Sequence, residues 1–213
     1  MKRATNLGLS GFIALAAFWA VSAAPCLAAT GQSKITEPTS DSDLSPYSPG
    51  SNNLALDLGQ VFLMGNLGNQ YSDAIGGQLH YTYGVSDLFG FDGSLGYSSH
   101  SNGQFSMATA LMGVRTNLSY YDKLIPYAIY GLGFYKPSYS YENASNTGQD
   151  SVSPVLFGLH LGLGVDLEIT HQIFFGAALT LHDVFGSEDQ TPAGLISTGG
   201  TFASFLLHAG VTF

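Results

Sequence analysis

The chain has 213 residues, among them 6 Lys and Arg against 15 Asp and Glu, and its formal net charge is −9. This balance excludes a nucleic-acid-binding role, because phosphate binding requires clustered Lys and Arg. Charged residues make up only 10% of the sequence, whereas soluble domains carry about 25%. A surface so poor in charge is unusual for a soluble protein.

The N-terminus has the features of a secretory signal peptide. Lys2 and Arg3 precede an apolar stretch over residues 7–24, and small residues close it at Ala28 and Ala29. We predict a signal peptide over residues 1–28, with cleavage after Ala29 as a close alternative. An uncleaved membrane anchor is a second alternative. A lipoprotein attached at Cys26 is a third, against which the preceding proline argues.

Cleavage would remove the only Cys and the only Trp of the chain, so the mature protein would not be a disulfide-stapled scaffold. It would keep four cations against all fifteen carboxylates, which gives a net charge of −11. The next segment, residues 29–52, is rich in Ser, Pro, Thr and Asp. We predict that it forms a disordered N-terminal arm.

The clearest pattern lies between Val155 and Ile169, where every odd-numbered residue is apolar and most even-numbered residues are small or polar. A period of two is typical of a β-strand, whose successive side chains point to opposite faces. This run exceeds the usual strand length of about 5–6 residues. It is long enough to cross a bilayer obliquely, which takes about 9–11 residues. Only a closed barrel lets strands cross lipid without unpaired backbone groups.

Turn signals divide the rest of the chain into further strands. The expected strands are 53–64, 74–85, 88–99, 105–118, 124–135, 155–169, 173–185 and 201–213. Short turns alternate with longer polar loops, as in transmembrane barrels whose turns are periplasmic and whose loops are extracellular. We therefore predict an all-β, eight-stranded antiparallel up-and-down transmembrane barrel over residues 53–213. No helical pattern follows the leader. The inside and outside faces of the fifth strand stay ambiguous. The alternative is a secreted soluble barrel of lipocalin type.

Several segments resemble bacterial outer-membrane barrels. Residues 207–213 are similar to the terminal signature that the barrel assembly machinery recognises, with Ala209, Val211 and Phe213 in its alternating apolar positions. Residues 83–87 resemble a first periplasmic turn, and residues 113–115, 126–127 and 131–134 resemble middle strands of that family. The similarity extends over residues 53–213 to small eight-stranded barrels of the OmpA, OmpX and OmpW type. It implies a Gram-negative outer-membrane protein, exported through the periplasm and surrounded by outer-membrane lipid and lipopolysaccharide.

The strand phases place five charged residues inside the barrel, in its periplasmic half: Asp57, Asp92, Arg115, Asp166 and Glu168. A buried charge is costly unless it is paired, so we predict that Arg115 binds one or more of these carboxylates. Asp92 is the first choice, because it lies on the adjacent strand at about the same height. We interpret the group as a structural lumen network; the alternative is a gate or a proton path.

Four histidines also point into the predicted lumen: His80, His160, His182 and His208. His160 and His182 would face each other across adjacent strands if the turn around His171 has three residues. Histidine pairs can bind metal, but no further His or Cys lies at ligand spacing. We predict hydrogen bonding in the lumen, with no metal and no cofactor.

An eight-stranded barrel is just wide enough to be filled by its own side chains. We therefore predict a monomeric, non-catalytic protein with a structural or surface-interaction role, in which the long acidic loops meet an extracellular ligand. A narrow OmpW-type channel lined by Val61, Leu63 and Leu206 is the alternative. A minor alternative is a lipid A-modifying hydrolase, because residues 100–103 resemble a segment of outer-membrane lipid A deacylases. In this chain, however, the His and Ser are adjacent in a loop, and no carboxylate is placed to orient the histidine.

Overall fold

The computed structural model describes residues 45–119, 123–142, 149–186, 188–191, 194–197 and 199–213. The predicted signal peptide and residues 29–44 of the predicted arm lie outside these ranges.

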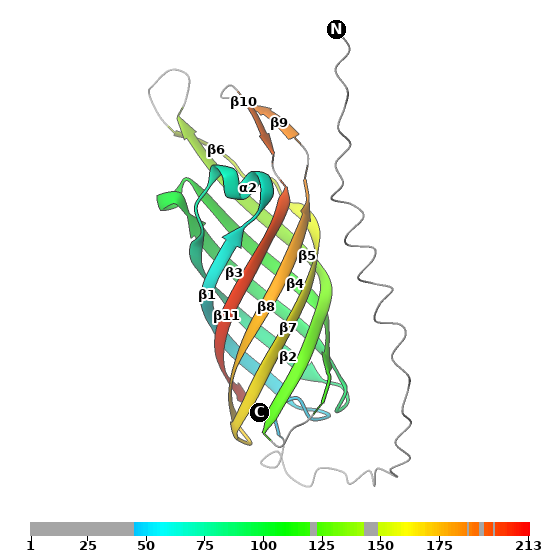
Figure 1. The fold of residues 1–213 in the computed structure, drawn as a ribbon. Helices are drawn as coiled ribbons and strands as arrows, with labels where there is room; N and C mark the ends of the chain where they lie inside the picture. The colour runs from blue at the N-terminus through cyan, green and yellow to red at the C-terminus, as the bar shows by residue number, and fades with distance from the viewer. Residues whose placement is uncertain (1–44, 120–122, 143–148, 187, 192–193, 198) are drawn as a thin grey trace. The chain divides into compact units, whose positions relative to one another are not determined.

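Eight long antiparallel strands form a closed barrel, as predicted. They are β1 (Asn52–Leu63), β2 (Ala74–Gly84), β3 (Phe89–His100), β4 (Phe105–Asn117), β5 (Leu124–Glu142), β7 (Leu156–Thr170), β8 (Ile173–Phe185) and β11 (Gly200–Thr212). Each strand pairs with the next in this order, and β1 pairs with β11 to close the ring (Figure 1). Closure leaves no long strand with an unpaired edge, which is the condition for crossing lipid.

One end of the barrel has short turns, and the other carries small elements between the strands (Figure 1). These elements are α2 (Gly65–Gln70), η3 (Ser101–Gly103), β6 (Gln149–Val152), β9 (Glu188–Thr191) and β10 (Gly194–Ser197). The helix α2 has six residues, too few to show a helical period in the sequence. The fifth strand is longer than predicted, because β5 continues past residue 135 to pair with β6.

The outward face of the barrel is largely apolar over all eight long strands, and its charged residues Lys136 and Asp183 lie toward the loop-bearing end. The predicted outward residues are exposed, for example Leu56 at 57%, Leu95 at 64% and Leu163 at 61%. In β5, whose phase the sequence left ambiguous, Tyr130, Leu132 and Phe134 face outward. Among the described residues, no helix has the length and apolar character needed to cross a bilayer.

The inward face holds the polar and charged side chains together with a second apolar group. The buried polar set includes Asp57, His80, Asp92, Arg115, His160, Asp166, His182 and His208. The buried apolar set includes Val61, Leu63, Met107, Tyr135, Phe202 and Leu206. The barrel is therefore apolar outside and mixed inside, the reverse of a soluble barrel of lipocalin type.

The outward assignment of β7 predicts the effect of a cation on the barrel wall. Leu163 lies midway along β7 and faces outward, so Leu163→Arg should destabilise the inserted barrel by about 2–4 kcal/mol. Val155→Arg is the matched control, because Val155 is outward but precedes the extracellular end of the strand, where the cost falls to about 0–1 kcal/mol. Urea titration of the protein folded in lipid vesicles gives the free energy of unfolding. Equal stability of the two variants would contradict the assignment.

Candidate functional site: the barrel lumen

The side chain of Arg115, on β4, lies in the lumen near the short-turn end of the barrel, where it is the centre of a group of contacts. Its side chain is 1% exposed, and its Nη2 donates to Asp166 Oδ2 at 2.7 Å. Its Nε donates to Asn117 Oδ1 at 2.9 Å. Tyr47 and Tyr127 stack on the guanidinium, with their ring centroids 3.4 and 3.6 Å from Cζ. The cation is thus bonded at its edge and covered by aromatic faces, an arrangement that suits a planar guanidinium.

Tyr47 comes from the segment that precedes the barrel. Residues 45–51 are held against the short-turn end by backbone hydrogen bonds, including Gly50 N to Gly84 O at 2.8 Å. Tyr47 has a φ of 64°, a conformation that bulky residues rarely adopt, and its ring is 3% exposed beside Phe174. Burial raises the pKa of its phenol well above the usual range. The predicted disordered arm therefore needs correction at its end, because these residues close the lumen.

A second charged group surrounds His80, on β2. Its Nε2 bonds Asp92 Oδ2, and its Nδ1 lies 3.5 Å from Asp57 Oδ2. Carboxylate oxygens only accept hydrogen bonds, so the ring satisfies both partners only with a proton on each nitrogen. Gln78 Nε2 also donates to Asp57 at 2.7 Å, and Thr82 Oγ1 donates to Asp92 at 3.0 Å. His80 therefore lies between two buried carboxylates, each of which also accepts a hydrogen bond from a polar side chain of β2.

The groups around Arg115 and His80 are neighbours. His208 bonds Asp166 Oδ1 through Nε2 at 2.6 Å, and its ring centroid lies 6.3 Å from that of His80. Gly176, on β8, faces this contact, and a Cβ there would overlap both the Asp166 carboxylate and the His208 ring. Position 176 therefore requires a glycine. The two charged groups of the lumen form one packed layer.

The structure corrects two details of the predicted network. Asp92 was expected to be the partner of Arg115, but Asp166 takes that place and Asp92 binds His80. Glu168 lies at the rim, where it pairs with His171 at 3.1 Å. Sequence reasoning also missed Tyr47, Tyr127 and Asn117. Tyr127 had no signal, because both faces of β5 are apolar or glycine, and Tyr47 lies outside any strand pattern.

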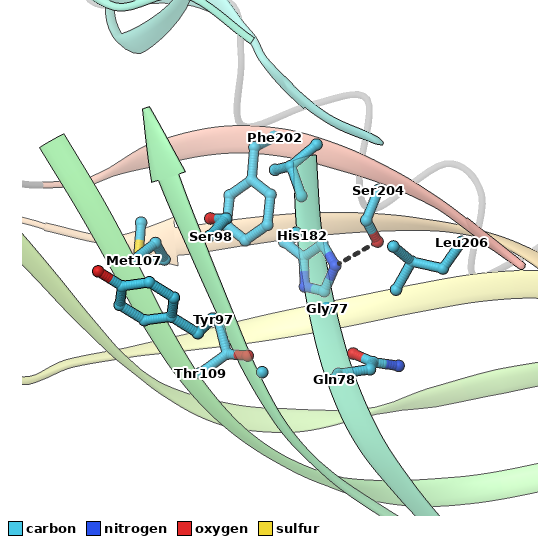
Figure 2. Close-up of a pocket in the computed structure, with 13 residues that line it drawn as sticks. Gly77, Gln78, Tyr97, Ser98, Met107, Thr109, His182, Phe202, Ser204 and Leu206 are labelled. Carbon is cyan, nitrogen blue, oxygen red and sulfur yellow. Dashed lines mark hydrogen bonds between the residues drawn. The ribbon is translucent and has the colours of Figure 1, made fainter. Parts of the chain in front are cut away.

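The other half of the lumen is apolar and contains the second pair of histidines. His160 and His182 are register partners on β7 and β8, as predicted, with ring centroids 6.2 Å apart. Figure 2 shows His182 beside Phe202 and its hydrogen bond to Ser204 Oγ, which measures 3.3 Å. The His182 ring stacks on Phe202 at 4.3 Å, and its other nitrogen shares a hydrogen bond of 3.1 Å with Tyr135. The cavity beside these groups has a volume of about 30 Å³.

Aromatic rings cover the lumen at the loop-bearing end. Phe105 lies among Tyr71, His100 and Tyr139, with ring centroids at 4.8, 5.3 and 5.1 Å. Leu67 of α2 is 1% exposed and packs in the same apolar cluster. Burial raises the pKa of the Tyr71 phenol. Both ends of the described lumen are therefore covered by side chains.

His100 does not pair with the adjacent Ser101. Its Nδ1 donates to the Ser72 carbonyl at 2.9 Å, which leaves Nε2 to accept from Ser98 Oγ at 2.9 Å. Ser98 and His100 are both buried, and the orienting group is a carbonyl rather than a carboxylate. Among the residues that the structure describes, no group of three or more His, Cys, Asp or Glu is arranged to hold a metal ion.

Comparison with known proteins identifies the family of this barrel. The family model described as the outer membrane protein beta-barrel domain matches residues 13–213. The chain belongs to this family. No curated protein sequence matches it.

Solved structures of outer-membrane barrels are similar in fold. Neisserial surface protein A is 15% identical in sequence and has a TM-score of 0.58. The match covers 76% of this chain and 97% of the chain of that protein. OprG from Pseudomonas aeruginosa is 12% identical and has a TM-score of 0.56, and the match covers 80% of this chain and 99% of OprG. Ail, the attachment invasion locus protein of Yersinia pestis, is 15% identical and has a TM-score of 0.51, and the match covers 78% of this chain and 99% of Ail. The protein is therefore an outer-membrane barrel, and its apolar outer face meets lipid.

The Arg115–Asp166 contact predicts a specific energetic coupling. Arg115→Met should lower the free energy of unfolding by about 3–5 kcal/mol, because it leaves a buried carboxylate without its cation. The double variant Arg115→Met with Asp166→Leu should recover part of this loss. Arg115→Met with Asp92→Leu is the matched control and should show little recovery, since Asp92 binds His80. Urea titration in lipid vesicles measures all four stabilities. Recovery in the Asp92 pair alone would contradict the observed pairing.

The Tyr47 contact predicts that an aromatic ring is needed at this position. Tyr47→Leu keeps the apolar bulk but removes the π face, so it should cost about 2 kcal/mol, the value of a desolvated cation–π contact. Tyr47→Phe keeps the ring and should retain most of that stability. The same titration compares the two variants. If Leu and Phe were equivalent, Tyr47 would act only by filling space.

Proposed function

We propose that this protein is a non-conducting, non-catalytic outer-membrane barrel whose role is structural or is carried by its extracellular loops. The observation that carries the proposal is the filled lumen. Tyr47 and the Arg115 network close the short-turn end, and the aromatic cluster around Phe105 covers the other. The cavity between them, about 30 Å³, has room for about two or three waters, each of which needs about 10–15 Å³. A solute would have to displace several packed layers.

A channel for small apolar solutes is the competing function. Val61, Leu63 and Leu206 do face inward, as that function requires. Val61 and Leu63, however, pack in one cluster with Met107 and Phe202 rather than around an open passage. The cluster joins β1 to the neighbouring β11, which carries Phe202, and to β4, three strands away, which carries Met107. Packing across these strands favours a structural core over a pore lining.

The absence of catalysis is also part of the proposal. The Ser98–His100 pair has the order of a nucleophile and its base, but a hydrolytic site also needs a carboxylate on the histidine and access for substrate. The Ser72 carbonyl occupies the position of the carboxylate. The exposures of Ser98 and His100 are 6% and 1%, so an ester would not reach them in this conformation.

The extracellular loops are the surface left for a partner. β9 and β10 pair only with each other, so among the described strands this hairpin adds nothing to the closure of the barrel. No Lys or Arg follows Lys136 in the sequence, while Glu142, Asp150, Glu188 and Asp189 fall in the loops or their hairpins. We infer that an extracellular partner would present positive charge to these loops.

The end of β11 supports recognition by the barrel assembly machinery during insertion. Phe213 and Val211 are exposed on the outer face, at 59% and 47%, and Ala209 lies on the same face. The backbone of Phe213 exchanges two hydrogen bonds with Asn52 at the β1–β11 junction. We propose that these three residues present the terminal signal before this junction closes.

Conductance separates the structural role from the channel. The refolded protein, incorporated in a planar lipid bilayer, should give no discrete current steps, because the proposal has side chains packed across the described lumen. A large water-filled porin in the same bilayer is the positive control. Reproducible single-channel steps that depend on the concentration of this protein would overturn the proposal and establish the channel.

A further inference from the structure

A groove with a volume of about 360 Å³ lies in the outer wall over β3, β4 and β5. The outward side chains along it are Leu95, Ala108, Ala110, Phe134, Lys136 and Val155. Gly96, Thr109 and Tyr135, which alternate with these residues along the three strands, also line the groove.

The strand register explains the shape of the groove. Ala110 on β4 lies between Leu95 on β3 and Phe134 on β5. One pair further toward the loops, Ala108 lies between Tyr97 and Lys136. Ala108 and Ala110 occupy two successive outward positions on the middle strand, and larger side chains flank them on both sides. The small alanines therefore leave a trough parallel to the strand. An apolar trough along a strand suits a methylene chain.

Lys136 marks the level at which the outer wall changes from apolar to polar. The next outward position toward the loops carries a hydroxyl on each of the three strands, at Ser99, Ser106 and Ser138. Lys136 is exposed, and of the Lys and Arg residues that the structure describes it alone lies on the lipid-facing wall. Arg115 is buried in the lumen, and Lys123 is in the turn at the opposite end of β5. A cation above an apolar trough is complementary to a lipid with an anionic headgroup.

We propose that this groove binds a phosphate-bearing lipid of the outer leaflet, with an acyl chain along Ala108 and Ala110 and the phosphate on the Lys136 ammonium. The loop-bearing end of an outer-membrane barrel is extracellular, so Lys136 lies at the headgroup level of the outer leaflet. Burial of the chain against the alanines supplies the apolar contact, and the lysine selects the headgroup. The serine hydroxyls donate further hydrogen bonds to phosphate oxygens. This inference is independent of whether the lumen conducts.

Native mass spectrometry of the barrel released from lipid nanodiscs tests the site. The nanodiscs contain phosphatidylcholine with a minor fraction of diphosphoryl lipid A, and the measurement is the number of lipid A molecules retained per barrel. The parent protein should retain one lipid A. Lys136→Gln should reduce retention about fivefold, the effect of removing one cation that faces an anionic lipid. Lys136→Arg should restore it.

Ala108→Leu fills the trough and should also reduce retention, whereas Ala177→Leu is its matched control on the outward face of β8. Lys123→Gln is the control for charge. Both controls should retain lipid A as the parent does, and heat-dependent migration on SDS gels shows that each variant is folded. Unchanged retention in Lys136→Gln would overturn the site. So would an equal loss in Ala177→Leu, which would show an unselective lipid layer.

Discussion

The backbone pairing of β1 with β11 is the constraint on which the rest of the structure depends. It runs from Asn53 opposite Thr212 to Leu63 opposite Phe202, and it joins the first and last long strands of the barrel. Without it, two strand edges would expose unpaired N–H and C=O groups to hydrocarbon, at a cost of several kcal/mol for each group. Closure also gives the sheet an inner and an outer face. Side chains that alternate along each strand therefore point in turn toward lipid and toward the lumen.

The enclosed lumen then determines the chemistry of its charged residues. Arg115 is only 1% exposed, so its guanidinium needs a carboxylate at the edge and aromatic rings over its faces. The neighbouring strand β5 supplies Tyr127, the next strand β7 supplies Asp166, and the segment before β1 supplies Tyr47. The same requirement places His80 between Asp57 and Asp92. Pairing of buried charge thus accounts for the packed charged layer inside the barrel, and under the proposed function the loops and the outer wall are the surfaces left for a partner.

The sequence predicts the fold well, because alternation over Val155–Ile169 is a local property that the closed sheet preserves. It also places Arg115, Asp166 and the four histidines inside, since facing depends only on strand phase. It does not predict the partner of Arg115, which depends on strand tilt and on distances across the lumen rather than on neighbouring strands. Tyr47 escapes prediction because residues 45–51 have no periodic pattern. The groove below Lys136 depends on the register of three strands, which turn positions define too loosely.

Hydrogen–deuterium exchange in lipid vesicles tests the closed barrel most directly. Amides in β1 and β11 should exchange as slowly as those in β3 and β7, because every long strand has a hydrogen-bonded neighbour on both sides. The short β9–β10 hairpin provides an internal reference for rapid exchange. Fast exchange confined to β1 and β11 would mean that these strands are open edges, and it would contradict the closed and filled barrel.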